Sequence, residues 1–263
     1  YVTGFPIIPT VAALILKLHG LEKLSLSPLR YITNAGAALP VEHVKRLRAL
    51  LPHVKIYSMY GCAECLRVSY LSPDEIDDRP SSVGKAIPNC EVFILDENGV
   101  PVKQGETGEL VVRGSHVMRG YWKSPELTEK VFGSGIMQGE ILLHTGDYFK
   151  QDSEGYLYFV CRKDDMIKTS GKKVSPKEVE NVLYCINGVI EASVIGVQDE
   201  ILGQAVKAFI VLMDGTDLRK NDILKYCSER LEKHMVPKYI EIIDRLPKTL
   251  NGKIDKLTLK QHV

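Results

Sequence analysis

The feature that most constrains the fold is a strand–loop–helix–strand rhythm in residues 30–61. RYITNAG (30–36) is typical of a buried strand that runs into a loop of small residues. VEHVKRLRALL (41–51) repeats apolar residues at helical spacing, and VKIYSMYG (54–61) is typical of a second strand. This order is typical of a βαβ unit in a parallel sheet, so the sequence predicts an α/β fold.

After this βαβ part (1–82), the pattern changes to short apolar runs separated by glycine, proline and Asn-Gly turns. Such runs predict a β-rich, antiparallel subdomain with the character of a distorted barrel over residues 83–163. The remainder, residues 164–263, combines a helix that begins at SPKEVENVL, two apolar strands, a helix at about 219–233 and a last strand. We therefore expect a larger N-terminal part, residues 1–163, followed by a small α+β domain.

Composition excludes several classes of protein. The net charge of +1 creates no global field for nucleic acid, so no nucleic-acid partner is expected. No apolar run reaches the length of a membrane span, because Lys17 and His19 interrupt the longest candidate. Six scattered cysteines suggest a reducing compartment, and we expect a cytoplasmic protein. Cys62 and Cys65 form a lone CxxC, which does not predict zinc; a redox role would need a helix N-terminus and a lowered thiol pKa.

Five short stretches carry residues suited to handling a nucleotide and a carboxylate. NAGAALP (34–40) is a small-residue loop against which a flat group can lie, and MYGCAE (59–64) offers an aromatic ring, a glycine and a carboxylate. HTGDY (144–148) presents an aspartate after a glycine turn. CRKDDMIKTSGKKVSPKEVE (161–180) combines an arginine, an acidic pair and a glycine turn, and NGK (251–253) places a lysine just past a turn.

Each stretch also has an ordinary structural explanation. Tyr60 suits a hydrophobic core, and Asp147 suits the cap of a turn. Arg162 and the aspartates after it suit a surface ion-pair cluster of little energetic value. Glu64 and Lys253 suit solvated positions. The order and spacing of the five stretches, rather than any single residue, therefore carry the functional hypothesis.

In that order the stretches resemble the motifs of the adenylate-forming superfamily, which includes acyl-CoA synthetases, luciferases and the adenylation domains of nonribosomal peptide synthetases. MYGCAEC is similar to the Tyr-Gly-x-Thr-Glu motif, HTGD to Thr-Gly-Asp, and CRKDDMIKTSGKKVSPKEVE to the hinge motif. GELVVRGSHVMRGYWKSPELT is close to the Gly-Glu-Leu…Arg-Gly-Tyr…Pro-Glu-x-Thr motif, and NGKIDK resembles the motif that carries the catalytic lysine.

The resemblance implies an AMP-forming acid–thiol ligase. Such an enzyme uses ATP and Mg²⁺ to convert a small-molecule carboxylic acid to an acyl-adenylate. It then transfers the acyl group to CoA or to the phosphopantetheine thiol of an acyl carrier protein. The sequences of the C-terminal motifs are most similar to those of bacterial-type acyl-CoA or acyl-carrier-protein ligases.

The resemblance also implies roles for individual residues. Tyr60 would stack on adenine, Asp147 would accept hydrogen bonds from the ribose with support from Arg162, and Glu64 would be a catalytic residue that holds Mg²⁺. The implied nucleotide-binding residues are Asn34, Ala35, Gly36, Ala37, Ala38, Tyr60, Gly61, Asp147 and Arg162.

The small C-terminal domain would act in both half-reactions. Lys253 would neutralise charge as the carboxylate approaches the phosphate, and Asp164 would be the hinge. A loop with Lys168, Gly171 and Lys172 would then replace the Lys253 loop for thioester formation.

Three departures from the family pattern qualify these expectations. Ala63 replaces a threonine whose hydroxyl bonds phosphate, and Cys161 replaces a glycine. The Ser/Thr/Gly-rich phosphate loop does not occur in the sequence, so we expect a C-terminal fragment of a longer protein that is inactive alone. An amino-acid adenylation fragment of the nonribosomal-peptide type, and a decayed noncatalytic nucleotide-binding protein, are the alternatives.

Overall fold

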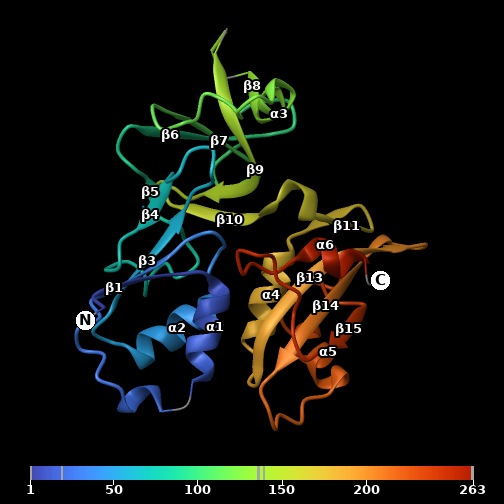
Figure 1. The fold of residues 1–263 in the computed structure, drawn as a ribbon. Coiled ribbons are helices and arrows are strands. Elements are labelled where there is room, and N and C mark those ends of the chain that lie inside the picture. The colour runs from blue at the N-terminus through green and yellow to red at the C-terminus, as the bar shows by residue number, and fades with distance from the viewer. Residues whose placement is uncertain (1, 19, 135–136, 139, 262–263) are drawn as a thin grey trace. The chain divides into compact units, whose positions relative to one another are not determined.

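The structure is a computed structural model that describes residues 2–18, 20–134, 137–138 and 140–261. It contains two compact units, which are described in turn (Figure 1). The first comprises Tyr1–Ile7, Ser25–Leu39 and Arg48–Asp164, and the second Ile8–Leu24, Pro40–Leu47 and Asp165–Val263. Two N-terminal segments thus group with the second unit, which the sequence did not indicate. The division into 1–163 and 164–263 stays a prediction.

The first sheet of the first unit follows the expected βαβ pattern. Its strands lie in the order β1 (Gly4–Ile7), β2 (Tyr31–Asn34), β3 (Lys55–Tyr60), β4 (Ser69–Leu71) and β5 (Lys85–Ala86). β1, β2 and β3 are parallel, whereas β4 and β5 join them in antiparallel fashion. The connections between the parallel strands contain α1 (Pro9–Lys17), the short 3₁₀ helix η1 (Leu21–Lys23) and α2 (Val41–Leu50).

The second sheet of the first unit is antiparallel, as the glycine- and proline-rich pattern predicts. Its strands lie in the order β10 (Leu157–Arg162), β9 (Ile141–Gln151), β7 (Gly108–Gly114) and β6 (Cys90–Leu95), and β8 (Phe132–Ser134) pairs with β9. Helix α3 (Pro125–Val131) precedes β8. Alternate apolar side chains of these strands form one core, in which Phe149, Leu110 and Leu157 are fully buried.

Backbone and side-chain bonds join the two sheets of the first unit. Val83 N donates to Leu157 O over 2.9 Å, and Leu157 N donates to Gly84 O over 2.8 Å. The buried Ser82 hydroxyl reinforces this junction, because it donates to Leu157 O and accepts from Gly84 N, both at 2.9 Å. The segment before β5 is thereby fixed to the start of β10.

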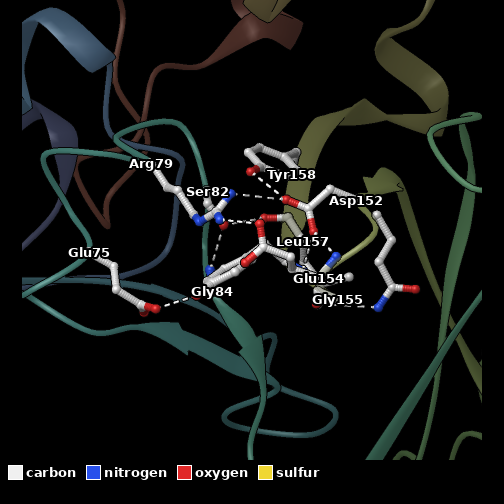
Figure 2. A network of polar contacts seen from close by, with 11 residues as sticks. Glu75, Arg79, Ser82, Gly84, Asp152, Glu154, Gly155, Leu157 and Tyr158 are labelled. Atoms are coloured by element: carbon white, nitrogen blue, oxygen red, sulfur yellow. Dashed lines mark hydrogen bonds and ion pairs between the residues drawn. The ribbon is translucent and has the colours of Figure 1, made fainter.

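An ionic network surrounds this junction (Figure 2). Arg79 reaches Asp152 over 3.4 Å and Glu154 over 2.5 Å, and its guanidinium lies 4.1 Å from the centre of the Tyr156 ring. Asp152 also accepts the Tyr158 hydroxyl over 2.9 Å. One arginine therefore holds the turn between β9 and β10 against the chain that leads to β5.

The second unit is built on a third sheet. Its strands lie in the order β12 (Lys172–Val174), β11 (Ile167–Thr169), β14 (Gly203–Leu212) and β13 (Val189–Asp199), and β15 (Tyr239–Ile242) runs parallel to β14. The 3₁₀ helix η2 (Lys163–Asp165) leads into this unit, and its helices are α4 (Pro176–Tyr184), α5 (Lys220–Ser228) and α6 (Lys256–Gln261). Separate hydrophobic clusters form on β13 and β14, one with α4 and α5 and the other with α6.

The helix predicted at 219–233 is shorter in the structure, because α5 ends at Ser228. The apolar spacing misled the prediction, since Leu231 packs against the same core from a turn after the helix. Its backbone N–H still reaches Cys227 O, over 2.9 Å. No helix among the described residues has the length and apolar character needed to cross a bilayer.

Ser82→Ala should destabilise the first unit by about 1–3 kcal/mol, because the buried Gly84 N–H loses its acceptor. Urea-induced unfolding measures this change. Ser153→Ala, in the exposed turn between β9 and β10, is the control, and its effect should stay within about 0.5 kcal/mol. Equal stability of the two variants would show that the Ser82 hydroxyl does not brace the junction.

Candidate functional site

The pairing of the middle of β9 with the end of β10 brings Asp147 and Arg162 together. The two residues lie directly opposite each other in the antiparallel pair, after a one-residue bulge between Phe159 and Cys161. The Arg162 Nε atom is 3.7 Å from Asp147 Oδ1, and the Asp147 carboxylate is largely buried whereas the Arg162 side chain is 61% exposed. The Tyr60 hydroxyl donates to Asp147 Oδ2 over 2.7 Å. The expected convergence of these three residues is therefore observed.

The irregular stretch of β9 before Asp147 is held by polar contacts. Gly146 adopts φ +70°, a left-handed conformation that favours glycine. Thr145 Oγ1 donates to Leu110 O over 2.7 Å and accepts the Asp147 N–H over 3.2 Å. Glu109 Oε1 accepts the Gly146 N–H over 3.1 Å. These contacts fix the backbone that presents the Asp147 carboxylate.

Tyr60 combines a core role with a polar one. Its ring packs edge-on against Phe149, with 4.7 Å between the ring centres. Burial and the neighbouring Asp147 carboxylate raise the pKa of the Tyr60 hydroxyl, so it stays a hydrogen-bond donor. The core explanation for Tyr60 therefore holds for its ring, and the hydroxyl additionally orients Asp147.

Glu64 lies in the turn after β3 and is held by the segment around Tyr121. The Tyr121 hydroxyl donates to Glu64 Oε1 over 2.5 Å, and Met118 N donates to Glu64 O over 2.7 Å. Burial opposes ionisation of Glu64, but hydrogen bonds, chiefly from Tyr121, and the charge of Arg162 lower its pKa below the ordinary value. Glu64 is therefore an ionised carboxylate close to the Asp147–Arg162 pair.

The loop at Gly61 is compact for reasons internal to the chain. A Cβ atom on Gly61 would lie 1.8 Å from Leu66 O, so no other residue fits there. Cys62 and Cys65 lie in the same turn with their sulfur atoms 3.3 Å apart. The hydrogen bond to Cys65, burial and the nearby Glu64 raise the pKa of the Cys62 thiol. The same hydrogen bond lowers the pKa of the Cys65 thiol. A redox protein built on this pair would also need a helix N-terminus, whereas the two cysteines lie in a turn between β3 and β4.

The small-residue loop begins at the same sheet edge as Tyr60. β2 and β3 are adjacent and parallel, with Asn34 opposite Ser58, so both loops leave the carboxyl ends of their strands. The Asn34 side chain is buried and its Nδ2 atom donates to Ala37 O over 3.0 Å, which closes the loop on itself. Gly36 adopts φ +83°. Ala35, Ala37 and Ala38 complete this loop.

The predicted residues of the second unit lie on two exposed turns. In the Lys253 turn, residues 249–253, Thr249 N donates to Lys253 O and Gly252 N donates to Thr249 O, both over 2.8 Å. Gly252 adopts φ +76°, as expected for an Asn-Gly turn, and the Lys253 side chain is exposed.

The second turn joins β11 to β12 and contains Gly171, at φ +75°. Lys168 and Lys172 flank it with exposed side chains, and Lys172 Nζ lies 3.8 Å from Glu232. Asp164, the predicted hinge, is also exposed.

Sequence reasoning missed Glu109 and Tyr121 as members of the site. Glu109 lies in GELVVRG and Tyr121 in RGYWKSP, two parts of a stretch that resembles a family motif. A predicted strand or loop does not identify the partner of either side chain. Glu109 meets His144 and Lys163 as well as Gly146. Their sequence signal is that each is a polar residue within a family motif to which no role had been assigned.

Glu109→Gln should destabilise the first unit in a pH-dependent way. The hydrogen bond to His144, with further help from Lys163, lowers the pKa of Glu109 from 4.5 to about 2 despite burial. This carboxylate therefore contributes stability above pH about 4.5, roughly 3 kcal/mol, which is lost as the pH falls toward 2.

Urea unfolding of Glu109→Gln and of the unmodified protein at pH 7 and at several values down to pH 2.5 measures the difference. Glu91→Gln, which removes an exposed charge paired with Arg113, is the control. A stability loss that is the same at every pH would contradict the lowered pKa.

Comparison with known proteins agrees with this geometry. Residues 1–122 match the AMP-binding enzymes, and residues 178–253 match the C-terminal domain of AMP-binding enzymes. A long-chain-fatty-acid–CoA ligase of Escherichia coli O157:H7 is 36% identical over 230 residues, which is 87% of this chain and 40% of that protein.

Solved structures are similar over nearly the whole chain. An amide bond synthetase from Marinactinospora thermotolerans is similar with a TM-score of 0.90 and 30% identity; the match covers 99% of this chain and 52% of the synthetase chain. An anthranilate CoA ligase in complex with anthranoyl-AMP is similar with a TM-score of 0.89 and 33% identity; the match covers 99% of this chain and 48% of the ligase chain. The chain spans 40% to 50% of the length of the curated relatives it matches. It belongs to the AMP-binding, adenylate-forming enzyme family.

Proposed function

We propose that the complete protein is an AMP-forming acid–thiol ligase. It would convert a small-molecule carboxylic acid to an acyl-adenylate and then to a thioester of CoA or of an acyl carrier protein. One observation carries this proposal: four of the expected site residues lie together in the first unit. Tyr60 donates a hydrogen bond to Asp147, and Arg162 forms an ion pair with Asp147. The charge of Arg162 also helps to lower the pKa of Glu64. A carboxylate and a nearby cation beside an aromatic ring suit a nucleotide.

The nucleotide would bind at the loops that leave β2 and β3. The Asp147 carboxylate accepts the Tyr60 hydroxyl and faces Arg162, and we propose that it accepts the ribose hydroxyls when a nucleotide is bound. Arg162 is exposed enough to contact the ribose or a phosphate. The adenine would lie between the Tyr60 ring and the backbone of residues 34–38, with Gly61 keeping the loop compact.

Glu64 fits a magnesium ion. Its pKa is lowered, so it is ionised, and Mg²⁺ is commonly bound by one or two carboxylates together with substrate phosphates. Among the described residues, no group of three or more His, Cys, Asp or Glu side chains could hold a metal by itself. When bound, the ion would offset the negative charge of the phosphates.

The chemistry would proceed in two half-reactions. A carboxylate oxygen of the acid bonds to the α-phosphorus of ATP, the bond to the pyrophosphate oxygen breaks, and pyrophosphate leaves. A thiol sulfur then bonds to the acyl carbon, the bond to the AMP oxygen breaks, and the thiol proton passes to solvent. Lys253, exposed just past its turn, would neutralise the charge that develops where two anions meet in the first half-reaction.

The C-terminal part, residues 164–263, would move between the two half-reactions. Lys163 is paired with Glu109 in the first unit and Asp165 with Lys260 in the second, so Asp164 is the exposed residue between two anchored neighbours. A pivot at Asp164 disturbs neither contact. Lys168, Gly171 and Lys172 would line the thiol path in the second conformation.

The acid and the compartment are proposed only as classes. The named relatives include ligases for long-chain fatty acids, indoleacetate and oxalate, so a panel of these acids is the appropriate first screen. All six cysteines are free thiols, which suits a reducing compartment, and we place the protein in the cytoplasm. Ala63, exposed in the Glu64 turn, offers no hydroxyl to phosphate.

Lys253→Ala in the natural full-length protein should lower the rate of pyrophosphate release about 10²- to 10³-fold, because a preorganised charge is lost from the transition state. The assay uses ATP and whichever of palmitate, indoleacetate and oxalate reacts fastest. Thioester formation from the matching acyl-adenylate and CoA should stay within about twofold.

Lys233→Ala, which removes an exposed lysine of the same unit, is the matched control and should change neither half-reaction. Unchanged pyrophosphate release in Lys253→Ala would refute the role of Lys253, and no release with any of the acids would remove support for a ligase.

Gly171→Leu should impair thioester formation more than pyrophosphate release, because added bulk would obstruct the thiol path. Gly171→Ala is the control for the backbone, since both variants lose the easy left-handed conformation at φ +75° and only leucine adds bulk. Nothing lies within 4 Å of a Cβ added at Gly171, so the Cβ of either variant meets no neighbour in this structure. Equal loss of both half-reactions in Gly171→Leu would contradict an alternating turn.

A further inference from the structure

Two lysines anchor the chain on either side of the Lys253 turn. Lys248 Nζ donates to Glu191 Oε1 over 2.8 Å, and Lys256 Nζ donates to Glu180 Oε1 over 2.8 Å. In contrast, no hydrogen bond or ion pair holds the Lys253 ammonium within the part of the chain that the structure describes. The position of this ammonium therefore depends on how firmly the chain around it is held.

The contact at Lys256 also involves the backbone of β13. Lys256 Nζ donates to Val194 O over 3.1 Å, and Glu180 Oε1 accepts the Val194 N–H over 2.9 Å. β13 is an edge strand, paired with β14 on one side. On its other side, Glu180 and Lys256 bind the N–H and C=O groups of Val194, which a further strand would otherwise bind.

Burial distinguishes these contacts from ordinary surface ion pairs. The side chains are 23% exposed for Lys256, 18% for Glu180 and 9% for Glu191. Ion pairs shielded from solvent are screened less and hold their geometry better than exposed ones. Asp255 adds to this fixation, because its carboxylate accepts the Leu257 and Thr258 N–H groups at the start of α6.

We infer that Lys256, paired with Glu180 and Val194, is a positioning residue for Lys253, with Lys248–Glu191 as the second anchor. This inference rests on the proposed function. Only two residues lie between Lys253 and Lys256, and α6 begins at Lys256, so a fixed Lys256 limits where the Lys253 stem can point. A displacement of about 1 Å at a catalytic group can cost about 10²-fold in rate.

Lys256→Met removes the charge and the donors but keeps the length of the side chain. In the natural full-length protein it should lower kcat for pyrophosphate release about tenfold to a hundredfold, with KM for ATP within about twofold. Thioester formation from supplied acyl-adenylate and CoA should be unchanged within the same limit. The acid is the one chosen for the Lys253→Ala assay.

Three further variants separate positioning from general stability. Lys256→Arg keeps the charge and donors and should retain activity within about threefold, even if Lys256→Met folds poorly. Glu180→Gln should show the same selective loss as Lys256→Met. Lys238→Met breaks an ion pair with Asp199 elsewhere in the unit and should change neither half-reaction.

The decisive measurement is the double variant Lys253→Ala/Lys256→Met. If Lys256 acts through Lys253, the double variant should lose no more pyrophosphate-release activity than Lys253→Ala alone. A further loss, an equal loss in both half-reactions, or full activity of both Lys256→Met and Glu180→Gln would overturn the inference. An unimpaired Lys253→Ala would instead refute the role proposed for Lys253 itself, so the two failures are distinguishable.

Discussion

The register between β9 and β10 is the constraint on which the candidate site depends. If the residue between Phe159 and Cys161 paired regularly instead of bulging, Cys161 would lie opposite Asp147 and Arg162 one position further along. Because neighbouring residues of a strand point to opposite faces, such a shift would separate the arginine from the aspartate. The bulge therefore selects which side chain meets the carboxylate. It also gives Cys161 a buried position that carries no part of the site.

In both units one carboxylate makes the same pair of contacts near candidate site residues. Glu109 accepts a backbone N–H from Gly146 and binds Lys163, while Glu180 accepts a backbone N–H from Val194 and binds Lys256. In each case one carboxylate accepts a backbone N–H and binds a lysine that is close in sequence to a candidate site residue. Each carboxylate therefore connects a strand to a lysine on another segment, and this connection limits how far that segment can move.

The sequence predicted the features that depend on local patterns. Parallel β2 and β3, the antiparallel second sheet and the Asn-Gly turn all follow from apolar spacing and turn residues that are close in the chain. The family motifs pointed to Tyr60, Asp147 and Arg162 because the motif order is readable without coordinates. That these three residues touch is a separate fact, which only the fold could supply.

What the sequence could not predict are pairings between distant positions. Tyr121 and Glu64 are separated by 57 positions, and nothing in either stretch specifies the other as its partner. The grouping of the N-terminal segments with the second unit and the early end of α5 are also set by packing. Apolar spacing indicates which side chains are buried, not which backbone groups form helical hydrogen bonds. Leu231 therefore fits the helical spacing although the backbone is no longer helical at that position.

The crowding around Gly61 affects how this motif should be used to judge other sequences. A Cβ there would collide with Leu66 O, so the glycine is required for the loop to close even in a protein that never meets a nucleotide. A descendant that lost catalysis would keep this glycine as long as it kept the fold. Under the proposed function, changes at Asp147, Arg162 and Lys253 are therefore a better sign of an inactive homologue than the presence of this glycine.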